Sequence, residues 1–250
     1  TLTVNTNASV GGTGARLSGG TFTGTGTITM PSGSALTWSA GQMLSTGTTT
    51  IASGGALAIT GSVGLDAGRT LLTQGTTTWT GGAIDLNPND NGSVGTPGGI
   101  LSIAAGGLLD VQTDGTVSAP FRGFGDGGTG ARVDNAGTFK KTAGAGTATV
   151  SVPLNNTGTV EVQSGSLRLQ QFTNNATARA SAGTLLLPGA TTSSNGTFTT
   201  TGTGLVDFPS GGTLTVNTNA SVGGTGVRLS GGPFTGTGTI TMPSGSALTW

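Results

Sequence analysis

The residues of this chain that are capable of acid–base chemistry are carboxylates, and most of them lie in one stretch. The chain has no His, Cys or Tyr and a single Glu, Glu161. Pairs of carboxylic acids at a defined separation hydrolyse glycosidic bonds, so a catalytic site here has to be built from Asp side chains. Six of the nine acidic residues fall between residues 85 and 134, namely Asp85, Asp90, Asp110, Asp114, Asp126 and Asp134.

Catalysis requires that several of these carboxylates converge. If the chain winds with a period of about 21 residues, as argued below, residues one period apart lie roughly 5 Å from each other. Asp110, Asp114 and Asp126 are then the candidates for convergence. The two lysines, Lys140 and Lys141, lie far in sequence from most of the cluster. We therefore expect no enzyme, and we keep a polysaccharide-degrading or polysaccharide-binding protein as the alternative.

The same stretch also contains residue types that bind calcium. Oxygen donors alternate in DLNPNDNG (residues 85–92), as they do in calcium loops, but Pro88 interrupts the pattern and the closing Glu is absent. The segment GGTGAR, which occurs twice, carries Arg where calcium-binding β-roll repeats need Asp. The sequence predicts no cofactor, with calcium as the alternative. Its candidate ligands are Asp85, Asn87, Asn89 and Asp90.

The same stretch also contains aromatic and basic residues in a segment without strand alternation, APFRGFGDGG (residues 119–128). Irregular segments of this kind on a regular scaffold are either solvated bulges or binding surfaces. Both interpretations stay open. If the segment is a surface for lateral contact, its candidate residues are Asp110, Asp114, Phe121, Arg122, Phe124 and Asp126.

The charge balance excludes several partners. Nine basic residues balance nine acidic ones, and charged residues make up only 7% of the chain. A surface this neutral attracts neither nucleic acid nor an anionic membrane. No apolar run approaches the roughly 18 residues that a membrane helix needs, so we expect no membrane insertion in this segment. Without Cys there is no disulfide framework.

The elements that position these residues repeat on two scales. Residues 1–38 recur as residues 213–250 with two differences, Ala15 to Val227 and Thr21 to Pro233. The sequence therefore predicts one complete long repeat at 1–212 and the start of the next at 213–250. Tandem arrays of this kind build fibres, stalks or solenoids.

A shorter period of about 21 residues runs inside the long repeat. The segments at 26–38, 47–59 and 68–80 resemble one another, and we expect Gly33, Gly54 and Gly75 to align in one file. Followed onward, this file passes through Gly106, Gly127 and Gly144, and about ten coils fill 212 residues. The wide step after Gly75 predicts a loop insertion near residues 83–97.

The pattern within each coil is that of short strands. Apolar residues alternate with polar ones, as in Ile28, Met30, Leu36 and Trp38, and Gly interrupts the alternation every six or seven residues. We expect an all-β fold, a parallel β-helix (β-solenoid), with Thr on the outward positions. Trp38 falls at an inward position, whereas Trp79 is out of phase and is expected to be exposed.

The second half of the long repeat resembles a known class of protein. An Asn–Gly turn leads into Thr and an apolar residue, and a G-x-L-x-apolar strand follows. This cadence resembles the β-strand repeats of large bacterial surface proteins, including filamentous-haemagglutinin-like adhesins and autotransporter passengers. The resemblance implies a right-handed parallel β-helix displayed outside the cell, with no catalytic residue. The segments that carry it are NAGTFKK (135–141), NTGTVEV (156–162), NGTFTTT (195–201), GSLRL (165–169), GTLLL (183–187) and GLVDF (204–208).

The sequence thus favours a structural role. We expect a rigid rod or spacer in an extracellular or cell-surface bacterial fibre, either an adhesin shaft or a stalk or sheath filament. Its partners would be further copies of the same repeat, and either identical fibres at its side or surface glycans. An ice-binding adhesin is a further alternative because Thr-X-Thr ranks occur, as in TGTGTIT and TTTWT, but they lapse through the middle of the repeat.

Overall fold

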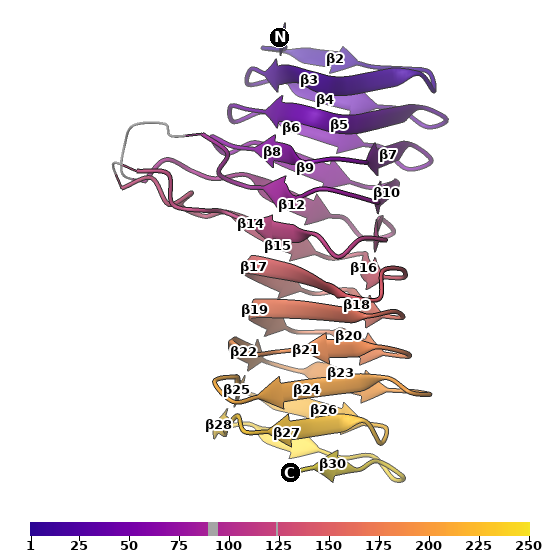
Figure 1. Cartoon of the computed structure of the whole chain (residues 1–250), viewed down its shortest axis with the longest axis vertical. Coiled ribbons are helices and arrows are strands. Elements are labelled where there is room, and N and C mark those ends of the chain that lie inside the picture. The colour runs from indigo at the N-terminus through magenta and orange to yellow at the C-terminus, as the bar shows by residue number, and fades with distance from the viewer. Residues whose placement is uncertain (90–94, 124) are drawn as a thin grey trace.

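The computed structural model describes residues 1–89, 95–123 and 125–250, so Asp90 and Phe124 lie outside the described residues. Within these ranges the chain forms thirty short strands, and every pairing between them is parallel. The strands stack into a rod with the two termini at opposite ends (Figure 1). The prediction of an all-β parallel β-solenoid is confirmed, with about 12 turns of roughly 21 residues. No helix in the described ranges is long and apolar enough to span a membrane.

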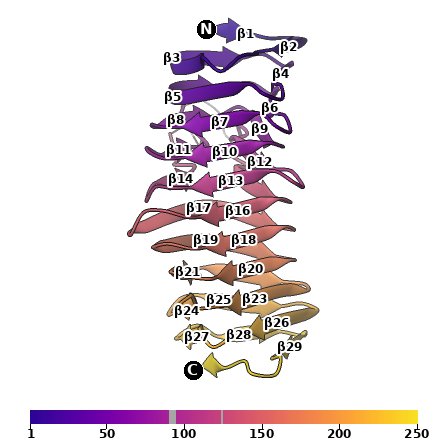
Figure 2. The same ribbon diagram turned by 90° about the vertical axis from the view of Figure 1, so that its right-hand side faces the viewer.

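The strands pair in three columns, which we call faces A, B and C. Each turn of chain contributes one strand to each face in the order A, B, C, and β3 (Ala15–Thr23), β5 (Ala35–Met43), β17 (Thr147–Asn156) and β19 (Ser166–Asn174) each bend round a corner and serve two faces. Figure 2 shows the stack from a second side.

Face A contains β2 (Asn7–Ser9), β4 (Thr27–Met30), β6 (Thr48–Ile51), β9 (Thr70–Thr73), β12 (Ile100–Ile103), β15 (Arg132–Asn135), the ends of β17 and β19, β22 (Ala190–Ser193), β25 (Thr213–Val216) and β28 (Phe234–Gly236). Face B contains the starts of β3 and β5, β7 (Ala56–Ile59), β10 (Thr76–Trp79), β13 (Leu108–Val111), β16 (Thr138–Lys141), β18 (Thr159–Val162), β20 (Thr177–Ala180), β23 (Gly196–Thr200), β26 (Asn219–Gly223) and β29 (Thr239–Thr241). Face C contains β1 (Leu2–Thr3), the ends of β3 and β5, β8 (Val63–Leu65), β11 (Ile84–Asp85), β14 (Thr116–Ser118), the starts of β17 and β19, β21 (Thr184–Leu186), β24 (Leu205–Pro209), β27 (Val227–Ser230) and β30 (Leu248–Thr249).

The core is a single apolar column inside the rod. Along most strands buried and half-buried residues alternate, because successive side chains of a strand point to opposite sides of the sheet. Inward residues of successive turns stack on each other, as Trp38 does on Ile59. Trp38 is fully buried, as predicted. Each buried Leu, Ile or Val contributes roughly 1.5–3 kcal/mol to folding.

Trp79 is buried too, so the prediction that it is exposed is wrong. Its strand β10 pairs with β7 at a step of 20 residues, which sets Trp79 opposite the inward Ile59. A step of 21 would have set it opposite the outward Ala58. The indole Nε1 donates to the backbone oxygen of Gly81 at 3.0 Å, so the buried ring keeps a hydrogen-bond partner.

The predicted file of glycines is correct at its start and wrong from Gly75 onward. The backbone nitrogen of Gly33 donates to the oxygen of Gly54 at 2.9 Å. Gly75 stacks on Gly55, however, because Thr76 lies opposite Ala56. From there the register continues the file through Gly107, Gly137 and Gly158, and omits Gly106, Gly127 and Gly144.

These aligned glycines lie where one turn passes closely over the backbone of another. A Cβ at Gly137 would lie 2.3 Å from the backbone oxygen of Ala104 and 2.4 Å from that of Gly107. No side chain fits at such a distance. The file therefore marks the corner between faces A and B, but the number of residues between its members varies with the length of the intervening turns.

A ladder of buried amides follows the same corner lower in the rod. The Nδ2 of Asn135 donates to the Oδ1 of Asn156 at 2.7 Å, and the Nδ2 of Asn156 donates to the Oδ1 of Asn174 at 2.8 Å. Each Nδ2 also reaches a backbone oxygen of the next turn at 2.9–3.0 Å. A buried polar group is costly unless it is hydrogen-bonded, and here stacking supplies acceptors for all three Nδ2 groups, while the Oδ1 of Asn135 at the end of the ladder has no partner.

The two copies of the 38-residue segment adopt the same strand pairings on different faces. Copy one places TLTV on face C and copy two places it on face A, and every later strand of the copy is shifted likewise. From β4 to β28 the chain makes nine full turns, and β29, the copy of β4, lies one face further on. One 212-residue repeat thus spans nine turns and one face, which refines the expected number of about ten. The matching register pairs are Leu2–Phe22 and Leu214–Phe234, Ala8–Ile28 and Ala220–Ile240, and Ala15–Leu36 and Val227–Leu248.

Candidate functional site: a ledge of two loops

Two long loops leave the rod at the same corner, in successive turns. The first, residues 86–99, joins β11 to β12, and the second, residues 119–131, joins β14 to β15. Both cross from face C to face A, and together they project from the side of the rod (Figure 1). We call the described part of this projection, residues 86–89, 95–99, 119–123 and 125–131, the ledge.

The first loop begins three residues after the start of the insertion predicted at residues 83–97, and it ends two residues after the end of that insertion. The second loop is not predicted from the sequence, because the expected file of glycines places Gly127 in a regular coil. One signal could have found it. The like strands β12 and β15 begin 32 residues apart, and a gap of that size in a 21-residue period indicates an insertion of about ten residues.

Backbone hydrogen bonds join the two loops into one unit. Gly98 donates its N–H to the oxygen of Thr129, and Thr129 donates to the oxygen of Thr96, both at 3.0 Å. At the root of the ledge, Leu86 donates to Ser118 at 2.7 Å. The ladder of parallel strands thus continues outward into the ledge.

Side chains also fix the loops to each other. The fully buried Asn87 donates from Nδ2 to the backbone oxygen of Pro120 at 2.9 Å. In return Arg122 donates from Nε to the backbone oxygen of Asn87 at 2.7 Å and forms an ion pair with Asp85. The Asn87 amide also donates to the backbone oxygen of Asp126 at 3.4 Å. These interactions fix the second loop to the first, and the Asp85 carboxylate compensates the Arg122 charge locally.

A second set of contacts ties the first loop to the turns above it. The buried Asp66 accepts hydrogen bonds at Oδ2 from the backbone nitrogen and the amide of Asn89, at 3.1 and 3.2 Å. The Asn89 amide also donates to Gln42 at 3.0 Å. The loop is thus held to the two turns above its own.

The second loop passes so close to the first that one position requires glycine. Gly128 has φ +62°, and a Cβ there would lie 2.8 Å from the Cβ of Asn87. Its backbone nitrogen is held by the carboxylate of the buried Asp126 at 3.1 Å. The neighbouring Gly127 has open space around it, so the constraint is local.

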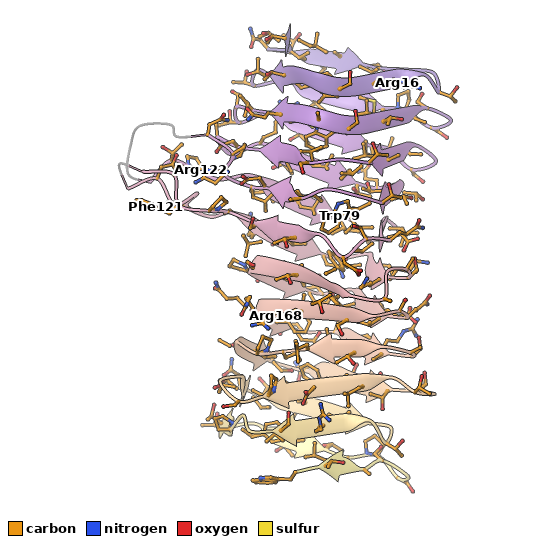
Figure 3. The ribbon with its side chains drawn as sticks, viewed as in Figure 1. Arg16, Trp79, Phe121, Arg122 and Arg168 are labelled. Atoms are coloured by element: carbon orange, nitrogen blue, oxygen red, sulfur yellow. The ribbon has the colours of Figure 1, made fainter. Side chains whose placement is uncertain are left out.

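Of the predicted lateral-contact residues, Phe121 and Arg122 lie on the outer part of the ledge (Figure 3). The Phe121 side chain is 70% exposed. Asp126 lies inside the ledge, fully buried. Asp110 and Asp114 are elsewhere, on face B and at the corner between faces B and C. The structure therefore gathers only part of the predicted set in one place.

Asp110 belongs to a ladder of alternating charges on the outside of face B. In register it lies opposite Lys140, Lys140 lies opposite Glu161, and Glu161 lies opposite Arg179. Arg179 donates to Glu161 at 2.7 Å. Burial raises the pKa of Glu161, but hydrogen bonds from Arg179, Gln163 and Ser181 outweigh it, so this pKa lies below its ordinary value.

Asp114 is paired with the one lysine whose side chain is fully buried among the described residues. The Lys141 ammonium donates to the Asp114 carboxylate at 2.8 Å and to three backbone oxygens at 2.6–3.3 Å. The hydrogen bond from Lys141 lowers the pKa of Asp114. Each lysine therefore lies beside one Asp of the cluster. Lys140 lies opposite Asp110 in register, and Lys141 forms an ion pair with Asp114 at a separate place.

Each described candidate calcium ligand makes a contact within the protein, although the Oδ1 of Asn87 is buried without a hydrogen-bond partner. The Asp85 carboxylate faces the Arg122 guanidinium, Asn87 directs its NH2 group at two backbone oxygens, and the Asn89 amide donates to Asp66 and Gln42. A cation at Asp85 would be repelled by Arg122, so these residues do not fit the ion as they are arranged. The described residues contain no cluster of three or more Asp, Glu, His or Cys side chains that could hold a metal.

The outward threonines form short ranks and not one continuous face. On face A, Thr29 and Thr50 stack in successive turns, and the rank then passes to Leu72 and Ser102. The lapse that the sequence indicates is therefore present in the structure.

No family model and no curated protein matches the chain. Among solved structures, a crystal structure of the TibC-catalysed hyper-glycosylated TibA 55–350 fragment aligns with 99% of this chain and 100% of that chain, at 19% sequence identity and a TM-score of 0.21. A score this low indicates neither family nor function. Beyond the solenoid fold, the resemblance to bacterial adhesins stays a prediction.

Proposed function

We propose that the chain is a structural repeat segment of an extracellular or cell-surface bacterial fibre, in which it acts as a rigid rod or spacer. One observation carries this proposal: residues 213–250 continue all three faces of the solenoid with the pairings that residues 1–38 use. Because the second copy stacks on the first through its backbone, further copies extend the rod without any new interface.

The construction of the rod supports this role. Each turn is bonded to the next on three faces, and a buried apolar column fills the interior from Val4 to Leu229. Bending the rod would break backbone hydrogen bonds on one face and compress the packed core on the other. A solenoid of this type is therefore stiff along its axis.

The surface suits exposure outside a cell. The outward positions are rich in Thr, the net charge is zero, and four of the five ion pairs among the described residues connect neighbouring turns. Surface ion pairs contribute little to stability and are screened by salt. Changes of salt concentration thus leave the main sources of stability untouched. The proposal includes no catalytic role, no cofactor and no nucleic-acid partner.

Immunogold electron microscopy tests the location and the form together. Antibodies raised against the 250-residue chain should label extended fibres on intact source cells. Labelling that appears only after lysis, with an antibody to a cytoplasmic protein giving the same pattern, would contradict the proposal.

A second candidate is glycan binding at the root of the ledge. Two clefts flank the ledge on either side, and both present hydroxyl, amide or carboxylate groups that suit sugar hydroxyls. A glycan array probed with the chain, alongside an Asp85→Asn variant, tests this function. The residues that line the clefts include Gln42, Ser62 and Asp85 on one side and Thr129, Ser151 and Gln171 on the other.

A further inference from the structure

The phase of the long repeat determines where successive ledges point. The copy of each strand lies one face further round the rod than its original, because one repeat spans nine turns and one face. In a chain with several copies, each ledge is therefore rotated by a third of a turn relative to the previous one. At about 4.8 Å per turn, it also lies about 45 Å further along the axis.

Three copies return the ledge to its first direction. Twenty-eight strand positions make up one repeat, so three repeats make 28 full turns, or about 134 Å at the spacing of parallel strands. A rod of many repeats thus carries three rows of ledges, one row on each side.

The ledge has the properties of a contact surface. Phe121 is 70% exposed, and the other exposed large apolar side chains among the described residues are Leu2, Met242 and Trp250, all within nine residues of a chain end. The loop that carries Phe121 is held by Arg122 and Asn87, so the ring is presented on a fixed support. Fixing a group in advance lowers the entropy lost on binding.

A neighbouring rod of the same chain is the partner that this arrangement fits. Two rods of zero net charge do not repel each other at long range. Ledges that recur at a fixed spacing can engage a second rod of the same period at many points at once, and such multivalency turns a weak contact into a stable one. A small ligand would gain nothing from the recurrence.

We propose that successive repeats present the ledge in three directions in turn, and that Phe121 and its surroundings bind neighbouring rods of the same chain on each side. This inference rests on the proposed function, since it needs a rod of several repeats. It predicts that each rod contacts neighbouring rods in up to three directions. The rods should therefore form bundles in preference to flat sheets.

Cryo-electron microscopy of the chain preceded by three further copies of residues 1–212 tests the phase. Ledges should appear about 45 Å apart, each a third of a turn from the last. Ledges aligned along one side would overturn the inference and leave the rod function intact. A compact particle in place of a rod would overturn both.

Sedimentation velocity of the same multi-repeat protein tests the contact. The unmodified protein should form lateral assemblies, and Phe121→Ser in every repeat should reduce the assembled fraction at least tenfold. The control is a single Met242→Ser change, which alters an exposed apolar residue in the last turn of the rod, away from the ledge, and should assemble as the unmodified protein does. Equal assembly of the Phe121→Ser protein would overturn the proposed contact.

Discussion

The Nε of Arg122, on the second loop of the ledge, donates a hydrogen bond to the backbone oxygen of Asn87, on the first loop, at 2.7 Å. The same guanidinium pairs with Asp85 at the root of the first loop. Two insertions that are separated by a whole turn of chain therefore form one structural unit. The predictions below concern the parts of the structure that depend on such contacts between turns.

Gly128→Ala should loosen the ledge without unfolding the rod. The new Cβ would lie 2.8 Å from Asn87, at a φ of +62° that side chains rarely adopt. Hydrogen exchange should accelerate at the amides of Gly98 and Thr129 and stay slow in the strands of the rod. Gly127→Ala is the matched control, since its Cβ meets open space. Equal exchange in both variants would contradict the close packing of the loops.

Asn156→Ala should destabilise the rod by roughly 2–4 kcal/mol, because it removes the buried Asn156 amide and with it one hydrogen-bond partner from each of two neighbouring buried amides. The Nδ2 of Asn135 and the Oδ1 of Asn174 both bond to Asn156. Urea unfolding followed by circular dichroism measures the change. The adjacent Asn155, which faces outward and bonds to Asp134, is the control, and Asn155→Ala should cost less than about 1 kcal/mol.

The tryptophans should differ sharply in their access to solvent. Trp38 and Trp79 are fully buried, and Trp250 is 93% exposed. Iodide should therefore quench part of the fluorescence of the native chain, and Trp250→Phe should abolish that quenching. Substantial quenching in the Trp250→Phe variant would show that Trp38 or Trp79 lies outside the core, and its loss on adding Trp79→Phe would identify Trp79.

Stability should be lost only in acid. Burial raises the pKa of Asp207, but hydrogen bonds from Arg228 and Ser230 outweigh it and lower this pKa, as happens for Glu161. A carboxyl with a lowered pKa in the folded state stabilises the protein above its unfolded pKa, and this contribution disappears as the pH falls through the folded pKa.

The free energy of unfolding should thus be constant between about pH 6 and pH 9, since no His is present, and fall below the ordinary pKa of 4.5 for Glu and 3.8 for Asp. Urea unfolding across this range measures it. Asp207→Asn should lower stability at pH 7, and the difference should shrink as the pH falls through the lowered pKa of Asp207, because the native carboxyl then becomes protonated as well. A stability difference that does not shrink in acid would assign the effect to packing.

Much of the rod could be predicted from the sequence, because strands within one turn are local patterns. The alternation around Ile28, Leu36 and Trp38 predicts their burial correctly. Register between turns is different, since it depends on how many residues each corner takes up. A corner one residue shorter brings Trp79 inward, and a second loop moves Gly127 out of the rod altogether.

In the ledge, too, the sequence predicts the local feature but not the contacts between turns. The stretch from residue 85 to residue 134 is irregular in sequence, and this predicts a departure from the rod. Which residues meet there depends on the overlay of two loops from different turns. Arg122 reaches Asp85 across 37 residues, and Asp110 and Asp114 remain outside the ledge. Spacing along the chain does not reveal such partners when one insertion lies between them and one of the partners lies within a second.

Small-angle X-ray scattering of the 250-residue chain, beside the same chain preceded by one further copy of residues 1–212, tests most directly that the windings stack into a rod that repetition lengthens. The maximum dimension should increase by about 45 Å, at about 4.8 Å per turn, while the radius of gyration of the cross-section stays constant. An unchanged length with a thicker cross-section would show that the copies lie side by side, and would contradict the account.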